Sequence, residues 1–151
     1  MFFHNLAQNN QIAFFDKADS WQDAIRLSCR SLVENGSVAE NYADQVIACV
    51  EKYGPYIVIV PGLAIPHCNE GNPSVFRSTI AYTKFRQEVV FPFLEDTRGA
   101  SVFFTLAASD PDTHLDNMAA LFNILSEEEV FRQVQEAEAV EDLLKIDYLI
   151  P

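Results

Sequence analysis

Two histidines stand where this sequence could hold a reactive side chain. His67 directly follows Pro66, which restricts its own backbone and that of Ile65, so the chain entering His67 is stiff. Gly62 lets the chain turn tightly before this segment. A neutral imidazole offers one nitrogen as a nucleophile while a hydrogen bond holds the other. His67 is therefore a candidate nucleophile, and the alternative is a structural histidine in a turn.

The second histidine, His114, lies just after a typical helix start. Asp110 is a good N-cap, and Pro111 suits the first helical position. The free N–H groups of a helix N-terminus favour anions. If folding brings His114 to His67, the two side chains and the helix start would form a pocket suited to a transferring phosphoryl group. The alternative is a solvent-facing helix residue.

Cys68 raises two rival interpretations of the same segment. One is a thiol nucleophile partnered by His67, and the other is a zinc site built from His67, Cys68, His114 and an acid. Neighbouring residues in an extended segment point in opposite directions, which weakens both. We expect no metal and interpret Cys68 as a packing residue, with Cys29 and Cys49 in the core.

The composition excludes several other functions. With 151 residues, about half of them apolar, the chain is expected to form one domain over residues 1–151. A net charge of −12 and scattered basic residues argue against nucleic-acid binding. No glycine-rich nucleotide loop occurs, so no cofactor is expected. No signal peptide is apparent and the longest apolar run, residues 56–61, cannot span a bilayer, so we expect a cytoplasmic protein without direct membrane insertion.

Hydrophobic patterning supplies the elements that must position these residues. Strands are expected over residues 11–15, 56–60, 78–85, 88–93 and 100–107, with 56–60 buried. Helices are expected from 21 to about 34, over 42–53, from 111 to about 125, from 126 onward and over 140–145. The helix after Asp110 should bury Leu115, Met118, Leu121, Phe122 and Leu125. Residues 1–10, including His4, are expected to be a mobile arm. Strands interspersed with helices favour an α/β architecture.

Residues 62–67, with the sequence GLAIPH, resemble the phosphorylation-site motif of the enzyme IIA family of phosphotransferase systems (PTS), of the mannitol, fructose and ascorbate type. His114-Leu115 looks like the second active-site histidine of that family. Residues 21–25 (WQDAI) and 54–59 (GPYIVI) look most like the ascorbate-type branch. The resemblance spans roughly residues 12–147. The chain departs from it after His67, where Cys68-Asn69-Glu70 replaces small and basic residues.

This resemblance implies a fold, a function and partners. The fold would be a three-layer α/β/α sandwich with a mixed five-stranded sheet. The phosphocarrier protein HPr would phosphorylate His67, and a IIB component would accept the group for sugar uptake through a IIC permease. His114 would stabilise the phosphoryl oxygens, while Asp110, Gly62 and Pro66 would support the site. An apolar rim including Leu63 would suit docking, and a homodimer is possible. The alternative is a regulatory module whose phosphorylation state controls binding to a target protein.

Overall fold

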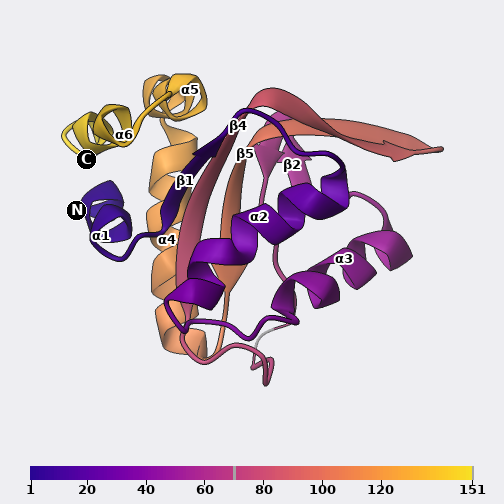
Figure 1. Ribbon diagram of the computed structural model, residues 1–151. Helices are drawn as coiled ribbons and strands as arrows, with labels where there is room; N and C mark the ends of the chain where they lie inside the picture. Colours follow the sequence, from indigo (N-terminus) through magenta and orange to yellow (C-terminus); the bar gives the residue numbers. More distant parts are fainter. Residues whose placement is uncertain (70, 151) are drawn as a thin grey trace.

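A mixed five-stranded sheet forms the centre of the computed structural model, which describes residues 1–69 and 71–150 (Figure 1). β4 pairs antiparallel with β5 and parallel with β1, and β3 pairs parallel with β5 and antiparallel with β2. The strand order is therefore β1-β4-β5-β3-β2. The strands are β1 (Ile12–Phe15), β2 (Val58–Val60), β3 (Gly62–Ala64), β4 (Thr79–Phe93) and β5 (Asp96–Ala107).

Helices cover both faces of the sheet (Figure 1). α2 (Trp21–Glu34) and α3 (Tyr42–Tyr53) pack on one face. The other face carries α1 (Phe2–Gln8), α4 (Pro111–Ser126), α5 (Glu128–Glu136) and α6 (Val140–Ile146). The predicted three-layer α/β/α sandwich with a mixed five-stranded sheet is confirmed.

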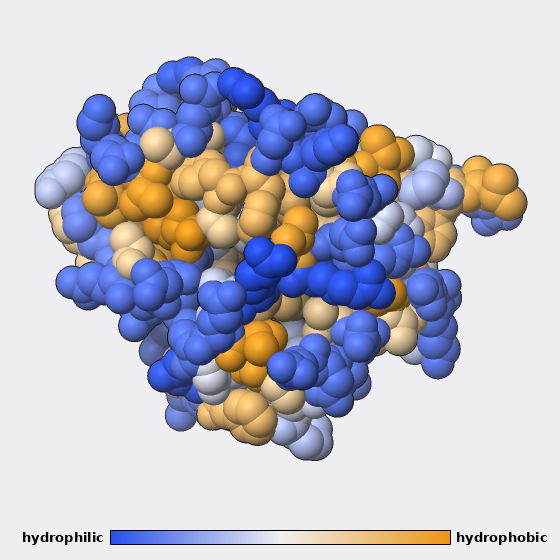
Figure 2. Space-filling view, in the orientation of Figure 1, coloured by the Kyte–Doolittle hydropathy of each residue, from blue (hydrophilic) through white to orange (hydrophobic). Residues whose placement is uncertain are grey.

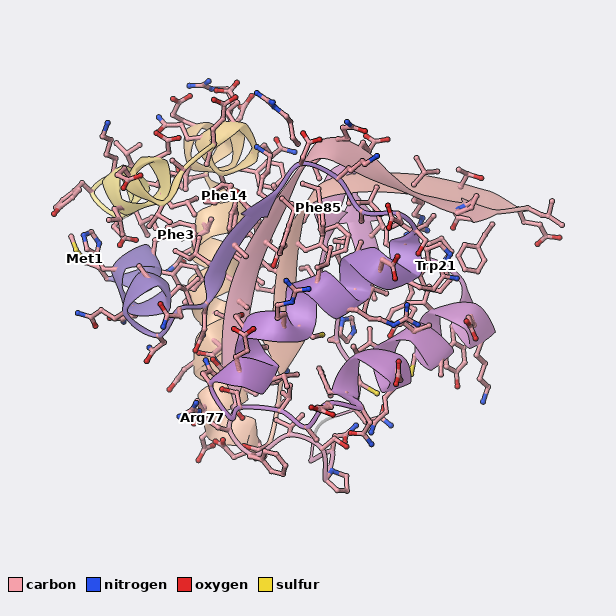
Figure 3. The ribbon with its side chains drawn as sticks, viewed as in Figure 1. Met1, Phe3, Phe14, Trp21, Arg77 and Phe85 are labelled. Carbon is pink, nitrogen blue, oxygen red and sulfur yellow. The ribbon has the colours of Figure 1, made fainter. Side chains whose placement is uncertain are left out.

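Each face of the sheet has its own hydrophobic core. On the α2 side, Trp21 and Phe85 are buried, and on the α1 side Phe3 is fully buried with Phe14 packed against the same core (Figure 3). α2 forms as its sequence predicts, since Ser20 accepts a hydrogen bond from the Asp23 N–H group and the apolar stripe faces inward. β5 contributes alternate residues to the two cores because successive strand side chains point to opposite faces.

The strands differ from the predicted ones in length and burial. The segments 78–85 and 88–93 form one continuous strand, β4, with an irregularity in its pairing between Lys84 and Val89. The expected buried strand at 56–60 is wrong in both respects: β2 begins at Val58, and Ile59 and Val60 are 54% and 43% exposed. β2 is one of the two edge strands of the sheet, a position that its apolar composition alone could not indicate.

The N-terminal residues differ from the expected mobile arm. They form α1, in which Phe3 is fully buried and Leu6 nearly so. The backbone N–H groups of Phe3 and His4 donate to the Asp147 carboxylate, each at 2.9 Å, and His4 Nδ1 lies 2.6 Å from the same group. A charged partner 143 residues away in the sequence therefore anchors this helix, which local sequence could not reveal.

The outer surface is largely hydrophilic in the view of Figure 2, with separate hydrophobic patches. The β4–β5 hairpin projects from the molecule, and Leu94 in its turn is fully exposed (Figure 1). In the part of the chain that the structure describes, no helix combines the length and apolar character needed to cross a membrane.

Candidate functional site

The candidate site lies at the edge of the sheet where β3 and β5 end. β3 and β5 are parallel neighbours, so their carboxyl ends meet at the same edge. His67 follows β3 by three residues, and His114 is the fourth residue of α4, which begins shortly after β5. The structure therefore places both candidate histidines at one edge of the sheet. This edge lies at the bottom of Figure 1.

The His67 side chain is held by its own backbone. Its Nδ1 atom lies 2.6 Å from the carbonyl oxygen of Ile65. A carbonyl oxygen can only accept, so Nδ1 carries the proton and donates it. In the neutral ring the lone pair is then on Nε2, which is the arrangement that nucleophilic attack from Nε2 requires. His67 is half-buried.

Tyr56 fixes the backbone of His67. The Tyr56 hydroxyl donates to the His67 carbonyl oxygen at 2.9 Å, and the two rings lie perpendicular with centroids 5.3 Å apart. Burial raises the pKa of the Tyr56 hydroxyl, with smaller contributions from Cys49 and Cys68. The hydroxyl therefore stays protonated and able to donate at neutral pH.

A second tyrosine joins the segment after β3 to β5. Tyr42, on α3, is almost fully buried, and its hydroxyl donates to the Leu106 carbonyl oxygen at 2.6 Å. The same hydroxyl interacts electrostatically with the backbone of Cys68. The Leu106 N–H group in turn donates to the Pro66 carbonyl oxygen at 2.9 Å. These contacts fix the segment after β3, which carries His67, relative to β5.

The start of α4 is organised by Asp110 and Ser78. Asp110 Oδ2 accepts from the Thr113 N–H group at 2.8 Å, which confirms the predicted N-cap. Ser78 Oγ donates to Asp110 Oδ1 at 2.9 Å and accepts from the N–H groups of Ser109 and Asp110. These hydrogen bonds, that of Thr113 first, lower the pKa of the Asp110 carboxyl. His114 is half-buried on the same turn, and its Nδ1 atom is shielded from solvent.

Gly62 and Pro66 border the His67 segment in different ways. Gly62 has a φ of +92°, and a Cβ atom there would lie 2.8 Å from Nε2 of Gln135 on α5. The backbone conformation therefore favours glycine, and the flexible Gln135 side chain would have to shift to admit a Cβ atom. Pro66 is buried, so it packs the segment against the sheet as well as stiffening it.

The cysteines are arranged differently from the prediction. Cys29 is a core residue as expected, but Cys49 is only partly buried, so its assignment to the core was wrong. Its sulfur lies 3.7 Å from that of Cys68. Within residues 1–69 and 71–150, no group of three or more His, Cys, Asp or Glu side chains is placed to hold a metal ion. Glu70, part of the departure after His67, lies outside the described residues.

Sequence reasoning missed three residues that contact the candidate site segments. Tyr56 and Ser78 were predicted to begin strands, and Tyr42 was predicted to begin a helix. These hydroxyls contact partners that are near in space but distant along the chain, so no local pattern could reveal their roles. The one local signal was the Gly54-Pro55 pair, which predicts a turn immediately before Tyr56.

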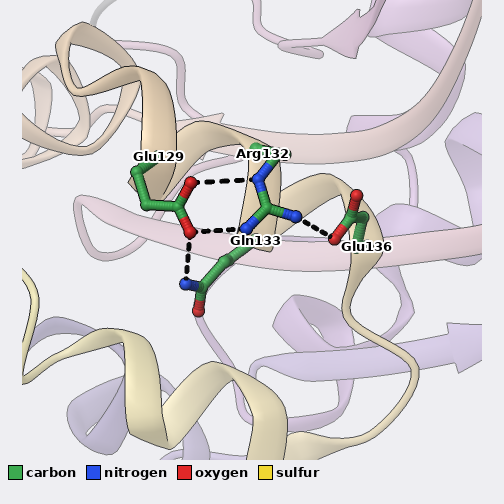
Figure 4. Close-up of polar contacts among 4 residues, drawn as sticks. All are labelled: Glu129, Arg132, Gln133 and Glu136. Carbon is green, nitrogen blue, oxygen red and sulfur yellow. Dashed lines mark hydrogen bonds and ion pairs between the residues drawn. The ribbon is translucent and has the colours of Figure 1, made fainter.

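Two other features of the surface lie apart from these histidines. Several charges on α5 are paired with one another, since Arg132 bridges Glu129 and Glu136 while Gln133 also bonds Glu129 (Figure 4). A hollow of about 680 Å³ lies towards the opposite end of the sheet. It is lined by Phe14, Phe15, Asp16, Lys84, Arg86, Glu136, Ala137 and Glu138. Neither His67 nor His114 lines this hollow. We therefore locate the candidate site by the two histidines and their hydrogen bonds, and not by a cavity.

Comparison with known proteins identifies what this chain resembles. Residues 5–147 match the family model described as phosphoenolpyruvate-dependent sugar phosphotransferase system, EIIA 2. The chain is 30% identical over 145 residues to the ascorbate-specific PTS system EIIA component of Shigella boydii serotype 4 (strain Sb227), covering 94% of this chain and 92% of that protein.

Two solved structures from Escherichia coli share the fold. The mannitol-specific cryptic phosphotransferase enzyme IIA superposes with a TM-score of 0.84 at 28% identity, covering 97% of each chain. The enzyme IIA in a complex with phosphorylated enzyme IIB of the mannitol system superposes with a TM-score of 0.74 at 23% identity, covering 90% of this chain and 92% of that one.

Proposed function

Because this chain belongs to the EIIA 2 family of the phosphoenolpyruvate-dependent sugar phosphotransferase system, we propose that it is a phosphocarrier, in which His67 accepts a phosphoryl group from HPr and passes it to a IIB component. The observation that carries this proposal is the hydrogen bond from His67 Nδ1 to the Ile65 carbonyl oxygen. That bond directs the lone pair of the neutral ring to Nε2, the atom that would attack phosphorus.

The transfer needs little covalent machinery. Nε2 of His67 forms a bond to phosphorus as the bond from phosphorus to the donor breaks, and the leaving group departs with its electron pair. The ring gains positive charge during this step, and the Nδ1–H bond to the Ile65 carbonyl becomes stronger as it does so. The Tyr56 hydroxyl holds the same backbone segment, so the ring need not reorient during transfer.

The role proposed for His114 is to hold the phosphoryl oxygens. It sits in a turn whose start Asp110 and Ser78 fix by side-chain hydrogen bonds. The N-terminal end of a helix carries a partial positive charge that favours an arriving phosphoryl group. Asp110 acts on this geometry by capping α4, and we assign it a positioning role.

A docking surface for partner proteins is proposed beside His114. The expectation of an exposed rim including Leu63 was wrong, because Leu63 is almost fully buried in the core on the α4 side of the sheet. Leu115 and Phe122 on α4 were expected to be buried but are 69% and 63% exposed. They share one face of the helix, as their spacing of seven residues requires, and this face would suit transient docking of HPr and of IIB.

The test is phosphoryl transfer with purified components. The protein is incubated with phosphoenolpyruvate, enzyme I and HPr, and the mass of one phosphate is sought on the intact chain. We expect an acid-labile, alkali-stable phosphate on the wild type and none on His67→Ala. His114→Ala should be phosphorylated much more slowly, because the attacking nitrogen remains while its oxygen-binding partner is lost.

Two controls make this experiment decisive. His4→Ala removes the histidine of α1, which contacts Asp147 rather than the candidate site, and this variant should be labelled like the wild type. A IIB component added afterwards should remove the phosphate from His67. Labelling of His67→Ala would overturn the assignment of the nucleophile. Labelled protein that no IIB component can discharge would instead favour the regulatory interpretation.

A further inference from the structure

Two thiols meet beside the candidate nucleophile although they come from different elements. Cys49 lies on α3 and Cys68 directly follows His67 in the loop after β3. Their sulfur atoms are 3.7 Å apart, and both side chains are partly exposed. A disulfide bond needs an S–S separation of about 2.0 Å, so a closure of less than about 2 Å would join them. Side-chain rotation with a small loop movement can supply this.

The thiol pair is connected to the backbone of His67. The Tyr56 hydroxyl, which donates to the His67 carbonyl oxygen, also interacts electrostatically with the Cys49 side chain. The Tyr42 hydroxyl donates to Leu106 and also interacts electrostatically with the backbone of Cys68. Any movement that draws Cys68 towards Cys49 therefore acts on the two hydroxyl contacts that hold the His67 segment.

We propose that a hydroperoxide oxidises Cys49 and Cys68 to a reversible disulfide that slows phosphoryl transfer at His67. In the first step one sulfur attacks a peroxide oxygen, the O–O bond breaks, and a sulfenic acid and one water or alcohol result. The second thiol then attacks the sulfenic sulfur, and the S–O bond breaks with loss of water. The two sulfurs give up two electrons, which the peroxide accepts.

The effect on transfer rests on the proposed function of His67. A bond between Cys49 and Cys68 removes the thiol that Tyr56 contacts and pulls on the residue next to His67. Misplacement of a reacting group by about 1 Å can cost about a hundredfold in rate. We expect the oxidised protein to accept phosphate at least about tenfold more slowly than the reduced protein.

Cys29 is a built-in control for this chemistry. It is 1% exposed, and burial raises the pKa of its thiol to about 12. Because the Cys29 sulfur is buried while the other two thiols are partly exposed, Cys29 should remain a free thiol when Cys49 and Cys68 are oxidised.

The first experiment asks whether the disulfide forms. The reduced full-length protein is treated with hydrogen peroxide, and intact mass and a non-reducing peptide map are recorded. We expect the loss of two hydrogen atoms, a crosslink between Cys49 and Cys68, and full reversal by dithiothreitol. Cys29→Ala should behave identically, while Cys49→Ser and Cys68→Ser should not form the crosslink. Oxygen adducts without the crosslink, or crosslinked dimers in its place, would overturn the proposal.

The second experiment asks whether the disulfide slows transfer. Catalase removes the peroxide before enzyme I, HPr and phosphoenolpyruvate are added, so only this protein has been oxidised. For each variant the measured quantity is the ratio of phosphorylation rates with and without peroxide. The ratio should fall at least about tenfold for wild type and Cys29→Ala, and stay near one for Cys49→Ser and Cys68→Ser. A wild-type ratio near one would show that the disulfide does not slow phosphoryl transfer. Failure of the reduced protein to accept phosphate would count against the proposed function, while the mass data would still decide the disulfide.

Discussion

At the scale of single residues, the chemistry of the candidate site depends on which nitrogen of His67 carries the proton. The carbonyl oxygen of Ile65 decides this, because it can accept but not donate. Pro66 lies between these two residues and restricts the backbone, which holds the Ile65 carbonyl oxygen within reach of the His67 ring. The nitrogen that would attack phosphorus in the proposed function is therefore selected by main-chain geometry rather than by a second side chain.

Removal of the Tyr56 hydroxyl tests the support of this geometry. In Tyr56→Phe the ring remains beside His67, but the hydrogen bond to the His67 carbonyl is lost. We expect the free energy of unfolding to fall by about 1 kcal/mol and phosphorylation to slow severalfold. Urea denaturation and the rate of phosphate incorporation measure the two effects. Tyr53→Phe is the matched control, since Tyr53 is 67% exposed; an equal effect of both changes would contradict the assignment.

At the scale of elements, the turn between β5 and α4 determines where His114 is presented. Ser78 is the residue before β4. Its hydroxyl accepts hydrogen bonds from two N–H groups of this turn and donates one to the cap residue Asp110. The turn is therefore tied to a neighbouring strand as well as capped locally. This arrangement makes the start of α4 sensitive to the charge state of a single carboxyl group.

The pH dependence of stability tests that sensitivity. The folded state lowers the pKa of Asp110 below its ordinary value of 3.8, so the carboxylate favours the folded state above that pH. This contribution disappears as the pH falls through the lower pKa of the folded state. Asp110→Asn keeps a good cap but cannot titrate. The wild type should have the higher melting temperature above about pH 5, and the difference should shrink below pH 3.8. A difference that does not change with pH would contradict this.

The packing of α1 provides a second prediction at this scale. Phe3 is fully buried against α6 and the sheet and touches the rings of Tyr82 and Phe104. Phe3→Ala should lower the free energy of unfolding by about 3–5 kcal/mol, because it removes a large side chain from a closed core. Chemical denaturation measures this. Phe76→Ala, at a residue that is 64% exposed, should change stability by less than about 0.5 kcal/mol. A similarly small effect at Phe3 would mean that α1 is undocked in solution.

At the scale of the whole molecule, one strand joins two cores. β5 places Phe103 in the core under α2 and α3, and Phe104 in the core under α1 and α4 to α6. A substitution that destabilises one core should therefore also lower the stability of the other, because β5 cannot leave one core while it remains packed in the other.

Unfolding of core variants tests this coupling. Trp21, the single tryptophan, lies in the core that contains Phe103. Phe104→Ala should lower the midpoint of the Trp21 fluorescence transition as much as that of the circular dichroism transition, with a loss of about 3–5 kcal/mol. Phe103→Ala is the matched variant in the other core. A Trp21 transition that Phe104→Ala leaves unchanged would show that the two cores unfold separately.

Much of the fold could be predicted from local patterns. The helices near α2, α3 and α4 followed from their apolar periodicity and from Ser20 and Asp110 as caps, because these signals act within one or two turns. β2 was misjudged as buried, because a short apolar run does not show whether it has one neighbouring strand or two. The exposure of Leu115 and Phe122 was missed for a similar reason, since periodicity shows an apolar face but not whether another element covers it.

The sequence by itself determined the α/β class, the stiff segment before His67 and the capped helix before His114, because each depends on residues close together in the chain. It also carried the family resemblance, which is a property of residue order. Only the tertiary structure decided that β3 lies parallel to β5, which puts both histidine-bearing segments at one edge of the sheet. It alone brought Tyr42, Tyr56 and the Cys49–Cys68 pair to that edge. Contacts between distant segments are made only when the whole chain packs, so no local pattern could specify them.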